Sequence, residues 1–477
     1  MSLTAAVFWL TYIIGTCVAV AMPAIGVALY VLVYHLNPEF QWWGESIRTT
    51  GLRTSFFVVI ACLVGMLLQG KHRRDVRLHM WPYALMVALA VWSWASLTWG
   101  VALTERGSFQ VEKFTKILVF IFILIRCASR PRELNLVLWA WVIGVGYVGY
   151  QAWGGVGERI GGRLSQGIGG PDFAESSDLA AHLIASLPLI GAMFFNARTW
   201  KGRSVTLIIG ALAVNAILLT RTRNAVFGLT AMAVASAFSL PRGYRVKGWT
   251  AIVVGGLLAY QLTDSGWWTR MSTIFEYSGD AAATDRLRFW RAAVDMSIDH
   301  PLGIGVGNFQ HYVLEYVPKL TIIRSAHSTY FECLAELGAP GLILLLTIIV
   351  AVMIRLNRVR RDARRIDPVV RMRLGGCETQ LHLGWQAMAL RAGLVGYLVC
   401  AMFTTRLWAE DLWILLGLSI CLGNVSRHAE MAQAEAPSNF TAVDSVRSLG
   451  SPPNPSPEPV LEDGIPKGAP GAYPMGR

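Results

Sequence analysis

A chain of 477 residues that is 54% hydrophobic and only 15% charged, with a mean hydropathy of +0.46, is too apolar for a water-soluble protein of its length. Its net charge of +12 does not indicate nucleic-acid binding, because the basic residues lie in short clusters between apolar stretches. A spanning helix needs about 20 mostly apolar residues. Because the chain holds many such stretches, its composition predicts an all-α polytopic membrane protein.

Taken in chain order, about 12 apolar segments are candidate transmembrane helices. They are residues 5–35, 54–70, 80–100, 112–126, 134–153, 178–196, 204–220, 224–240, 249–263, 341–357, 392–407 and 412–426. Pro23 interrupts the first segment, which therefore crosses the membrane either once or, as two helices, twice. Residues 428–477 hold nine prolines and no apolar periodicity, which is typical of a disordered tail.

The basic clusters alternate along the chain with connections that hold few Lys or Arg residues. Five clusters carry 21 of the 42 Lys and Arg and fall on every second connection: residues 71–79, 126–132, 198–203, 242–247 and 355–373. Basic loops stay in the cytoplasm, so these five are predicted to be cytoplasmic. The connections predicted to face outward are 36–53, 101–111, 154–177, 221–223, 264–340 and 407–411. The C-terminus is then inside, and the N-terminus is inside after one crossing of 5–35 or outside after two.

The stretch "LLTRTRNAVFGL" (218–229) places Arg221 and Arg223 between two apolar segments of 17 residues each. Each segment is just long enough to span the bilayer core of about 30 Å, so the arginines are predicted to form a tight turn at the outer surface. Two interpretations remain open. The arginines either extend to lipid phosphates, or they form a site for an anion.

The longest outward connection contains "TDRLRFWRAAVDMSIDHPLGIGVGNF" (284–309), which predicts a helix with Thr284 as its N-cap. Arg286 and Arg288 would then lie in the first turn, where helix amides and Arg side chains together favour a bound phosphate. The alternative is a solvated charged face. The residues expected to form the apolar face of this helix are Leu287, Trp290, Val294 and Ile298.

The stretch "HSTYFECLAELGAPG" (327–341) predicts a short helix that ends at Gly338 and Pro340, before the next span. His327 would begin this helix, where the helix dipole keeps an imidazole neutral and able to act as a base. A purely structural histidine is the alternative. Glu332 and Glu336 share one face and are expected to hold the helix through internal hydrogen bonds.

In this order, the three motifs resemble the O-antigen ligase superfamily, which covers lipopolysaccharide O-antigen ligases, polysaccharide polymerases and protein O-glycosylation ligases. The resemblance is strongest between about residues 204 and 357. It implies that Arg223, Arg286 and His327 are the catalytic residues. It also implies a glycan donor linked to undecaprenyl pyrophosphate, with neither a metal nor a nucleotide cofactor.

Two further segments bear on the acceptor and on the site. "NPEFQWWGESIR" (37–48) is similar to the O-glycosylation ligases associated with exosortase systems, so protein or another polymer is an alternative acceptor to lipid A-core. Ser328 follows His327 where family members often have asparagine, which concerns how the acceptor is positioned. The outward connection 154–177 contributes Arg163 as a further glycan or phosphate contact.

Together these features predict a membrane glycosyltransferase domain over residues 1–427, with 264–340 as one large helical periplasmic loop, and a cytoplasmic tail over 428–477. The bacterial inner membrane is its expected location. Arg221, Arg288 and Arg163 are predicted to bind substrate around the catalytic residues. Two alternatives stay open: a polysaccharide polymerase that uses the same donor, and a transporter or flippase of lipid-linked saccharides.

Overall fold

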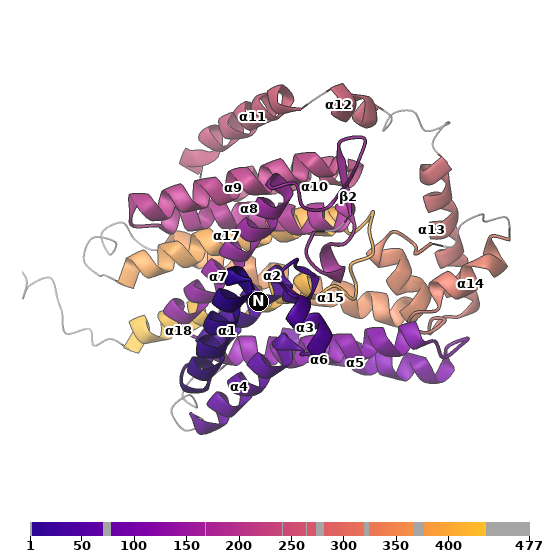
Figure 1. Ribbon diagram of the computed structural model, residues 1–477, viewed down its shortest axis with the longest axis horizontal. Helices are drawn as coiled ribbons and strands as arrows, with labels where there is room; N and C mark the ends of the chain where they lie inside the picture. Colours follow the sequence, from indigo (N-terminus) through magenta and orange to yellow (C-terminus); the bar gives the residue numbers. More distant parts are fainter. Residues whose placement is uncertain are drawn as a thin grey trace, which may run out of the picture. The chain divides into compact units, whose positions relative to one another are not determined.

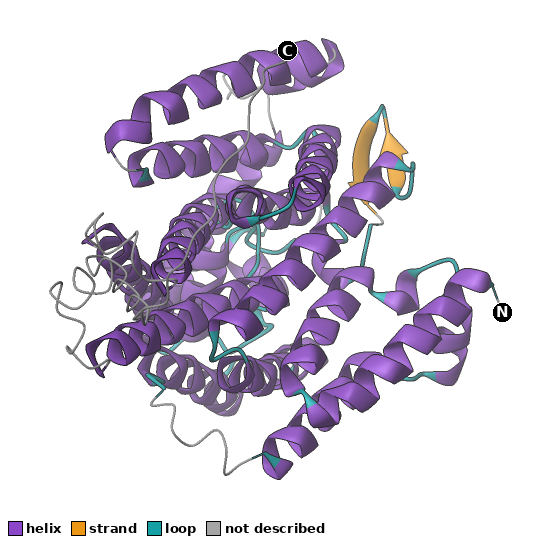
Figure 2. Ribbon diagram, turned by 90° about the vertical axis from the view of Figure 1, so that its left-hand side faces the viewer, coloured by secondary structure: helices purple, strands orange, loops and turns teal. Residues whose placement is uncertain are grey.

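The computed structural model describes residues 2–69, 78–166, 168–240, 242–263, 265–272, 281–318, 324–365 and 376–435. Over these residues the chain is almost entirely helical, with one small two-stranded hairpin in orange in Figure 2. Seven of the described helices are long and apolar enough to cross a membrane. The predicted class, an all-α polytopic membrane protein, is confirmed.

The seven membrane-spanning helices are α1 (Leu3–Ala21), α7 (Pro131–Trp153), α8 (Ser176–Asn196), α9 (Trp200–Thr220), α15 (Thr329–Arg365), α17 (Gly376–Cys400) and α18 (Glu410–Glu435). The other helices before α9 are α2 (Pro23–Leu36), α3 (Glu45–Thr50), α4 (Thr54–Leu68), α5 (Trp81–Trp99) and α6 (Glu105–Cys127). Those after it are α10 (Arg223–Ser239), α11 (Arg245–Leu262), α12 (Ser265–Ser272), α13 (Ala281–Asp299) and α14 (Phe309–Tyr316). The hairpin strands are β1 (Glu158–Ile160) and β2 (Arg163–Gln166), and single 3-10 turns cover Pro38–Phe40, Pro171–Phe173 and Arg242–Tyr244.

The first predicted span consists of two helices, α1 and α2, which meet at Met22. Pro23 begins α2, because a proline at the first helical position has no amide to donate. The two helices pack antiparallel, with Leu29 against Gly15 and Gly26 against Ala19. Of the two alternatives for residues 5–35, the structure therefore favours two helices over one.

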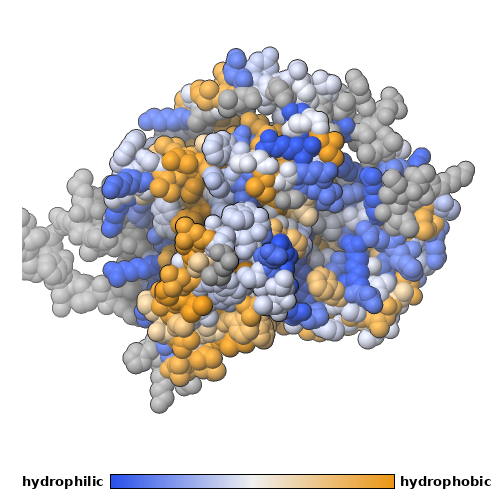
Figure 3. Space-filling view, in the orientation of Figure 1, coloured by the Kyte–Doolittle hydropathy of each residue, from blue (hydrophilic) through white to orange (hydrophobic). Residues whose placement is uncertain are grey.

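The helices of the bundle lie side by side, as Figure 1 shows for α8, α9, α10 and α17. Of the seven candidate spanning helices, α18 is the most enclosed and α1 is the most exposed. Exposed apolar side chains cover α1 and α4, in orange in Figure 3. Such a surface is unfavourable in water and suits contact with lipid. The residues that form it are Leu3, Val7, Leu10, Ile13, Ile14, Phe56, Phe57, Ile60, Val64, Leu67 and Leu68.

The connections predicted to share one side of the membrane meet at one end of the bundle. The Val101 amide donates to the Ile304 carbonyl at 2.9 Å, and the Thr329 amide donates to the Ala401 carbonyl at 2.9 Å. We call this the loop end, formed by residues 37–53, 100–111, 154–166, 168–177, 221–223, 300–309, 324–328 and 401–409. At the other end, the described residues of two basic connections are in contact: Arg355 donates to the His79 carbonyl at 3.2 Å, and the His79 amide donates to Asn424 of α18 at 3.0 Å.

Several segment boundaries differ from the sequence prediction, among them the ends of α17 and α18. The predicted span 392–407 is wrong at its end, because α17 stops at Cys400 and residues 401–409 form a loop. The side chains of Thr404 and Arg406 in this loop bond to α8 and to the segment before it. Helix α18 continues to Glu435, into the predicted tail, whose residues 436–477 lie outside the described part of the chain.

Candidate functional site at the loop end of the bundle

The turn between α9 and α10 gives its two arginines different environments. Arg221 follows the last residue of α9 in the left-handed conformation (φ 45°), and its guanidinium donates to the Gly161 carbonyl at 2.9 Å. It thereby ties the β-hairpin loop to α9. Arg223 is the first residue of α10, and its side chain is half-buried. Unpaired amides at a helix N-terminus favour a bound anion, so Arg223 has the better environment for a phosphate.

Arg163 lies on β2 and contacts the ends of two helices. Its Nε donates to the carbonyl of Thr220 at 3.0 Å, and its Nη2 donates to the Ser176 hydroxyl at 2.5 Å. A guanidinium at the C-terminus of α9 also complements the helix dipole. These contacts give Arg163 a structural role in fixing the loop before α8, and its contact with substrate stays a prediction.

Helix α13 carries Arg286 and Arg288, but it does not start at Thr284. The chain is already helical at Ala281, so Thr284 is not an N-cap and the two arginines lie beyond the first turn. The argument that placed a phosphate at this helix N-terminus is therefore wrong. Arg288 is exposed and pairs with Asp285 at 3.4 Å, on a surface where such a pair contributes little stability.

The predicted apolar face of α13 is also wrong. Leu287, Val294 and Ile298 are exposed, and only Trp290 of the predicted set is half-buried. The helix instead packs through small and aromatic side chains that fit closely against α14 and α15. The buried residues are Phe289, Ala292, Ala293 and Met296.

His327 lies just before α15, half-buried and in the left-handed conformation (φ 47°). Burial lowers the pKa of His327, and the nearby charge of Arg286 lowers it further. Glu175, before α8, acts in the opposite direction and raises this pKa, and Arg324 lowers it. The imidazole is therefore kept neutral, as a general base requires. The sequence did not single out Glu175 or Arg324.

Four aromatic side chains connect α10, α13, α15 and the loop between α17 and α18. We call Phe227, Trp290, Phe331 and Phe403 the aromatic cluster. Phe403 lies 5.4 Å from Phe227 and 6.2 Å from Trp290, and Trp290 stacks on Phe331 at 5.0 Å, all between ring centroids. These spacings are those of interacting aromatic rings.

Each predicted catalytic residue is a close neighbour of this cluster in the chain. Arg223 precedes Phe227 by four residues on α10, and Arg286 precedes Trp290 by four on α13, so each pair shares a helix face. His327 follows Ala326, whose carbonyl accepts a hydrogen bond from Trp290 Nε1 at 3.1 Å. The aromatic cluster therefore connects the segments that carry the three residues, α10, α13 and the start of α15.

The glycine-rich loop that follows α13 packs closely against α15. Gly303, Gly305 and Gly307 all have positive φ, and a side chain at Gly303 would meet the Glu336 carbonyl oxygen at 2.4 Å. Glu336 accepts a hydrogen bond from the Phe309 amide at 3.3 Å. Backbones that approach this closely leave no space for a side chain, so these positions require glycine. The glycine-rich stretch therefore has a packing role.

The two glutamates of α15 and its kink follow the sequence prediction. Glu332 accepts a hydrogen bond from the Thr405 hydroxyl at 2.7 Å, and Glu336 bonds the glycine-rich loop. Both carboxyl groups are buried and serve as internal hydrogen-bond partners. The helix is interrupted at Gly338 (φ 67°, ψ −174°), where the short helix was predicted to end.

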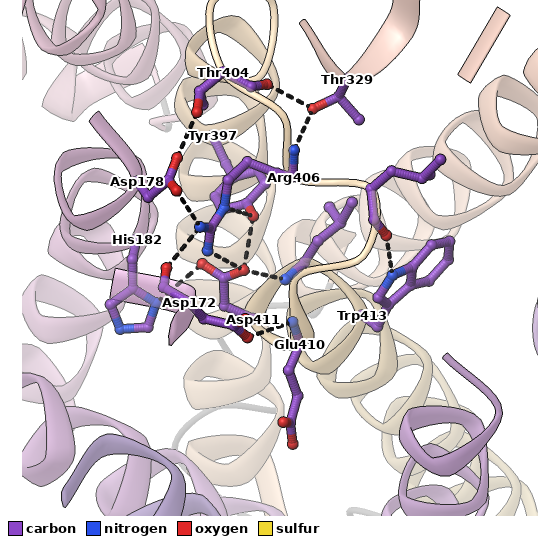
Figure 4. A network of polar contacts seen from close by, with 12 residues as sticks. Asp172, Asp178, His182, Thr329, Tyr397, Thr404, Arg406, Glu410, Asp411 and Trp413 are labelled. Carbon is purple, nitrogen blue, oxygen red and sulfur yellow. Dashed lines mark hydrogen bonds and ion pairs between the residues drawn. The ribbon is translucent and has the colours of Figure 1, made fainter. Parts of the chain in front are cut away.

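A buried charge network at the loop end was missed in the sequence. Arg406 is 1% exposed, and its guanidinium lies at the centre of Figure 4, facing Asp178 at 3.2 Å and Asp411 at 2.7 Å. It also donates to the Tyr397 hydroxyl at 3.0 Å and to the Asp172 carbonyl at 2.6 Å. Burial alone would lower the pKa of Arg406, but the surrounding acidic groups raise it well above its ordinary value. Arg406 is thus a permanent cation that joins α8, α17, α18 and the loop before α8.

The network extends beyond Arg406. The Asp172 carboxylate pairs with Lys113 at 2.7 Å and accepts from the Glu410 amide at 2.8 Å, and His182 lies 3.3 Å from Asp411. The sequence offered one signal, a lone arginine followed within five residues by two carboxylates in "RLWAED". It was overlooked because Arg406 was assigned to the end of a span.

An apolar cavity of about 750 Å³ runs along α9, between α8 and α11. Its lining extends along α9 from Thr206 to Leu219, with Arg221 and Trp267 also on its wall. The other lining residues are almost all apolar: Leu187, Ile190, Gly191, Phe194, Leu207, Gly210, Ala211, Val214, Asn215, Leu218, Gly255, Leu258 and Thr263. Cavities with such a lining suit apolar ligands.

The fold and the site together define a helical membrane protein with arginines and one neutral histidine gathered at one end of its bundle. Residues 206–346 match the family model described as O-antigen ligase. This segment includes Arg223, Arg286 and His327, whereas Arg163 and Arg406 lie outside it. The match confirms the resemblance seen in the sequence over this segment, and it supports a membrane glycosyltransferase of the ligase or polymerase type. No match was found among curated proteins.

Proposed function

We propose that this protein transfers a glycan from undecaprenyl pyrophosphate to an acceptor hydroxyl at the periplasmic face of the bacterial inner membrane. The acceptor is lipid A-core or, alternatively, protein. In this proposal the loop end is periplasmic and the chain crosses the membrane about 12 times. The observation that supports the proposal is the aromatic cluster, which connects the helices and the segment that carry Arg223, Arg286 and His327, within a stretch that matches the O-antigen ligase family.

The donor's pyrophosphate binds at Arg223 and Arg286, with Arg221 and Arg288 farther out. Two cations in a partly buried site stabilise the negative charge that develops on the leaving group, which is often the largest contribution to catalysis. The apolar cavity along α9 suits the donor's prenyl chain, because its lining includes Arg221, only two residues from Arg223. A lipid chain held there would bring its phosphate to the turn between α9 and α10.

His327 acts as the general base. It accepts the proton of the acceptor hydroxyl as the oxygen attacks the anomeric carbon, so the new glycosidic bond forms while the bond to pyrophosphate breaks. The products are the glycosylated acceptor, undecaprenyl pyrophosphate and a protonated His327. A single displacement of this kind inverts the anomeric centre. The lowered pKa of His327 supports this role, because the neutral imidazole is the reactive form.

The test is a transfer assay with the purified full chain, a lipid-pyrophosphate glycan and candidate acceptors, in which the product is identified by mass. We expect Arg223→Ala, Arg286→Ala and His327→Ala each to lower transfer at least about 100-fold, as loss of an electrostatic or acid–base group does. Arg291→Ala is the matched control, because Arg291 is exposed on the same helix as Arg286. Full activity of all three variants would rule out this site.

The same assay separates the alternatives. A product in which the glycan extends a second lipid-linked glycan would identify a polymerase, which needs the same donor site. Translocation of the donor across vesicles without a new glycosidic bond would identify a transporter.

A further inference from the structure

Thr329, the first residue of α15, makes hydrogen bonds through both its amide and its hydroxyl to the connection between α17 and α18. Its amide donates to the carbonyls of Ala401 at 2.9 Å and Thr404 at 3.1 Å. Its hydroxyl donates to the Thr404 carbonyl at 2.8 Å and accepts from the Arg406 amide at 2.9 Å. The donor of this hydroxyl and one of its acceptor sites are thus both used within residues 401–406.

The segment that holds Thr329 is itself held by buried charge (Figure 4). Arg406 contributes its backbone amide to Thr329 and its guanidinium to Asp178, Asp411 and Tyr397. The Thr404 hydroxyl donates to Asp178 as well. Moving one member of a buried ion pair away from the other is costly, so residues 404–406 form a rigid platform for the start of α15.

His327 lies between this platform and a second attachment. On its N-terminal side, the Ala326 carbonyl is bonded to Trp290 on α13. On its C-terminal side, Ser328 and Thr329 are buried. The left-handed backbone of His327 (φ 47°) is unfavourable for a residue other than glycine and persists only where its surroundings enforce it.

We propose that Thr329 is the positioning residue for His327, and that its hydroxyl, fixed to the platform of residues 404–406, sets the backbone conformation that directs the imidazole into the site. The proposal rests on the proposed function only in treating His327 as the base. Thr329 touches neither substrate nor reacting atoms and acts through His327.

The kinetic test compares Thr329→Val, which removes the hydroxyl at nearly constant shape, with Thr329→Ser, which keeps it. We expect Thr329→Val to lower kcat about 10- to 100-fold, because small displacements of a catalytic group have effects of that size, and to leave the KM for donor unchanged. Thr329→Ser should restore most of kcat. Thr347→Val is the matched control, because the Thr347 hydroxyl donates within its own helix, to the Ile343 carbonyl at 2.7 Å.

A second measurement does not depend on transfer. NMR titration of the full chain with ¹³C-labelled histidine follows the His327 signal, assigned by its loss in His327→Gln. In the parent chain burial, Arg286 and Arg324 lower the pKa of His327 while Glu175 raises it. Thr329→Val should move this pKa towards its ordinary value, because the imidazole leaves its buried position, whereas Thr329→Ser and Thr347→Val should not.

The outcomes separate the two proposals. A Thr329→Val variant that keeps both kcat and the His327 titration would overturn the positioning role. So would one that only loses thermal stability and donor affinity, since that pattern describes a purely structural threonine. If the parent chain forms no glycosidic bond but the His327 titration still responds to Thr329→Val, the proposed function fails and the positioning role stands.

Discussion

At the scale of single residues, the environment of His327 combines burial with charges of both signs. Burial and Arg286 lower the pKa of His327, Glu175 raises it and Arg324 lowers it. The three charged residues come from the loop before α8, from α13 and from the segment before α15. Their combined effect decides at which pH the imidazole is free to accept a proton.

Opposite shifts of the pH profile are expected from two substitutions near His327. A neutral imidazole is the active base, so kcat/KM should rise with pH through the pKa of His327 in the free enzyme. Arg324→Gln removes a cation, raises this pKa and moves the rising limb to higher pH. Glu175→Gln removes an anion and moves it to lower pH.

The measurement is kcat/KM for transfer between about pH 5 and pH 8, where histidine titrates. The shifts should shrink as salt is added, because both charges are partly exposed to solvent. Shifts in the same direction for both variants would contradict the assignment of the limb to His327.

At the scale of elements, the glycine-rich loop joins α13 to α15 through backbone contacts. Gly303 faces the kink at Gly338, and Gly305 and Gly307 face the backbone of Gly100 and Gly107. The amides of Ile304 and Gly305 donate to the carbonyls of Ala335 and Glu336. Side chains have no space between such surfaces, so three glycines with positive φ hold the helix of Arg286 against the helix that follows His327.

Gly303→Ala should destabilise the protein by about 1–3 kcal/mol, the usual cost of a strained backbone at a residue with a side chain. The added methyl group would also meet the Glu336 carbonyl oxygen at 2.4 Å. Gly256→Ala on α11 is the control, since a side chain there meets nothing within 4 Å. Thermal unfolding in detergent, followed by tryptophan fluorescence, measures both. Equal stability of the two variants would contradict the packing role.

At the scale of the whole bundle, the described connections of the two kinds contact opposite ends of α15, at Thr329 and at Arg355. The loop end collects the predicted outward segments, and the basic end collects His79, Asn424 and Arg355. The antiparallel pair α1 and α2 brings the beginning of α1 beside residues 43–54, where the Tyr12 hydroxyl donates to the Thr54 carbonyl at 2.7 Å. The N-terminus is therefore expected on the same side of the membrane as the candidate site.

Accessibility to a membrane-impermeant maleimide should differ between the two ends. Glu158→Cys on the β-hairpin should react in intact cells, and Lys201→Cys at the start of α9 should react only after permeabilisation. Both positions are exposed, and labelling of the parent chain gives the background. Reaction of both variants in intact cells would contradict the placement of the two segments on opposite sides, and the reverse pattern would invert the orientation.

Much of the architecture was predictable because its signals are local. Apolar stretches of sufficient length mark spanning helices, and a glycine followed closely by a proline marks the interruption of α15 at Gly338. The order of three motifs also identified the O-antigen ligase domain. The start of α13 and its buried face were predicted wrongly, because the helix is already formed at Ala281 and packs through small residues that a hydrophobicity pattern ranks low.

The sequence by itself determined the class of protein, the alternation of its connections and the residue types of the site, since these follow from hydropathy, charge and short motifs. Only the tertiary structure decided the different environments of Arg221 and Arg223, the contact of Arg163 with the end of α9 and the buried network around Arg406. Arg406 meets Asp178 across more than 200 residues of chain. Local sequence patterns do not reveal partners that are so far apart in the chain. Contacts of this kind form only when helices pack and exclude water from the charges between them.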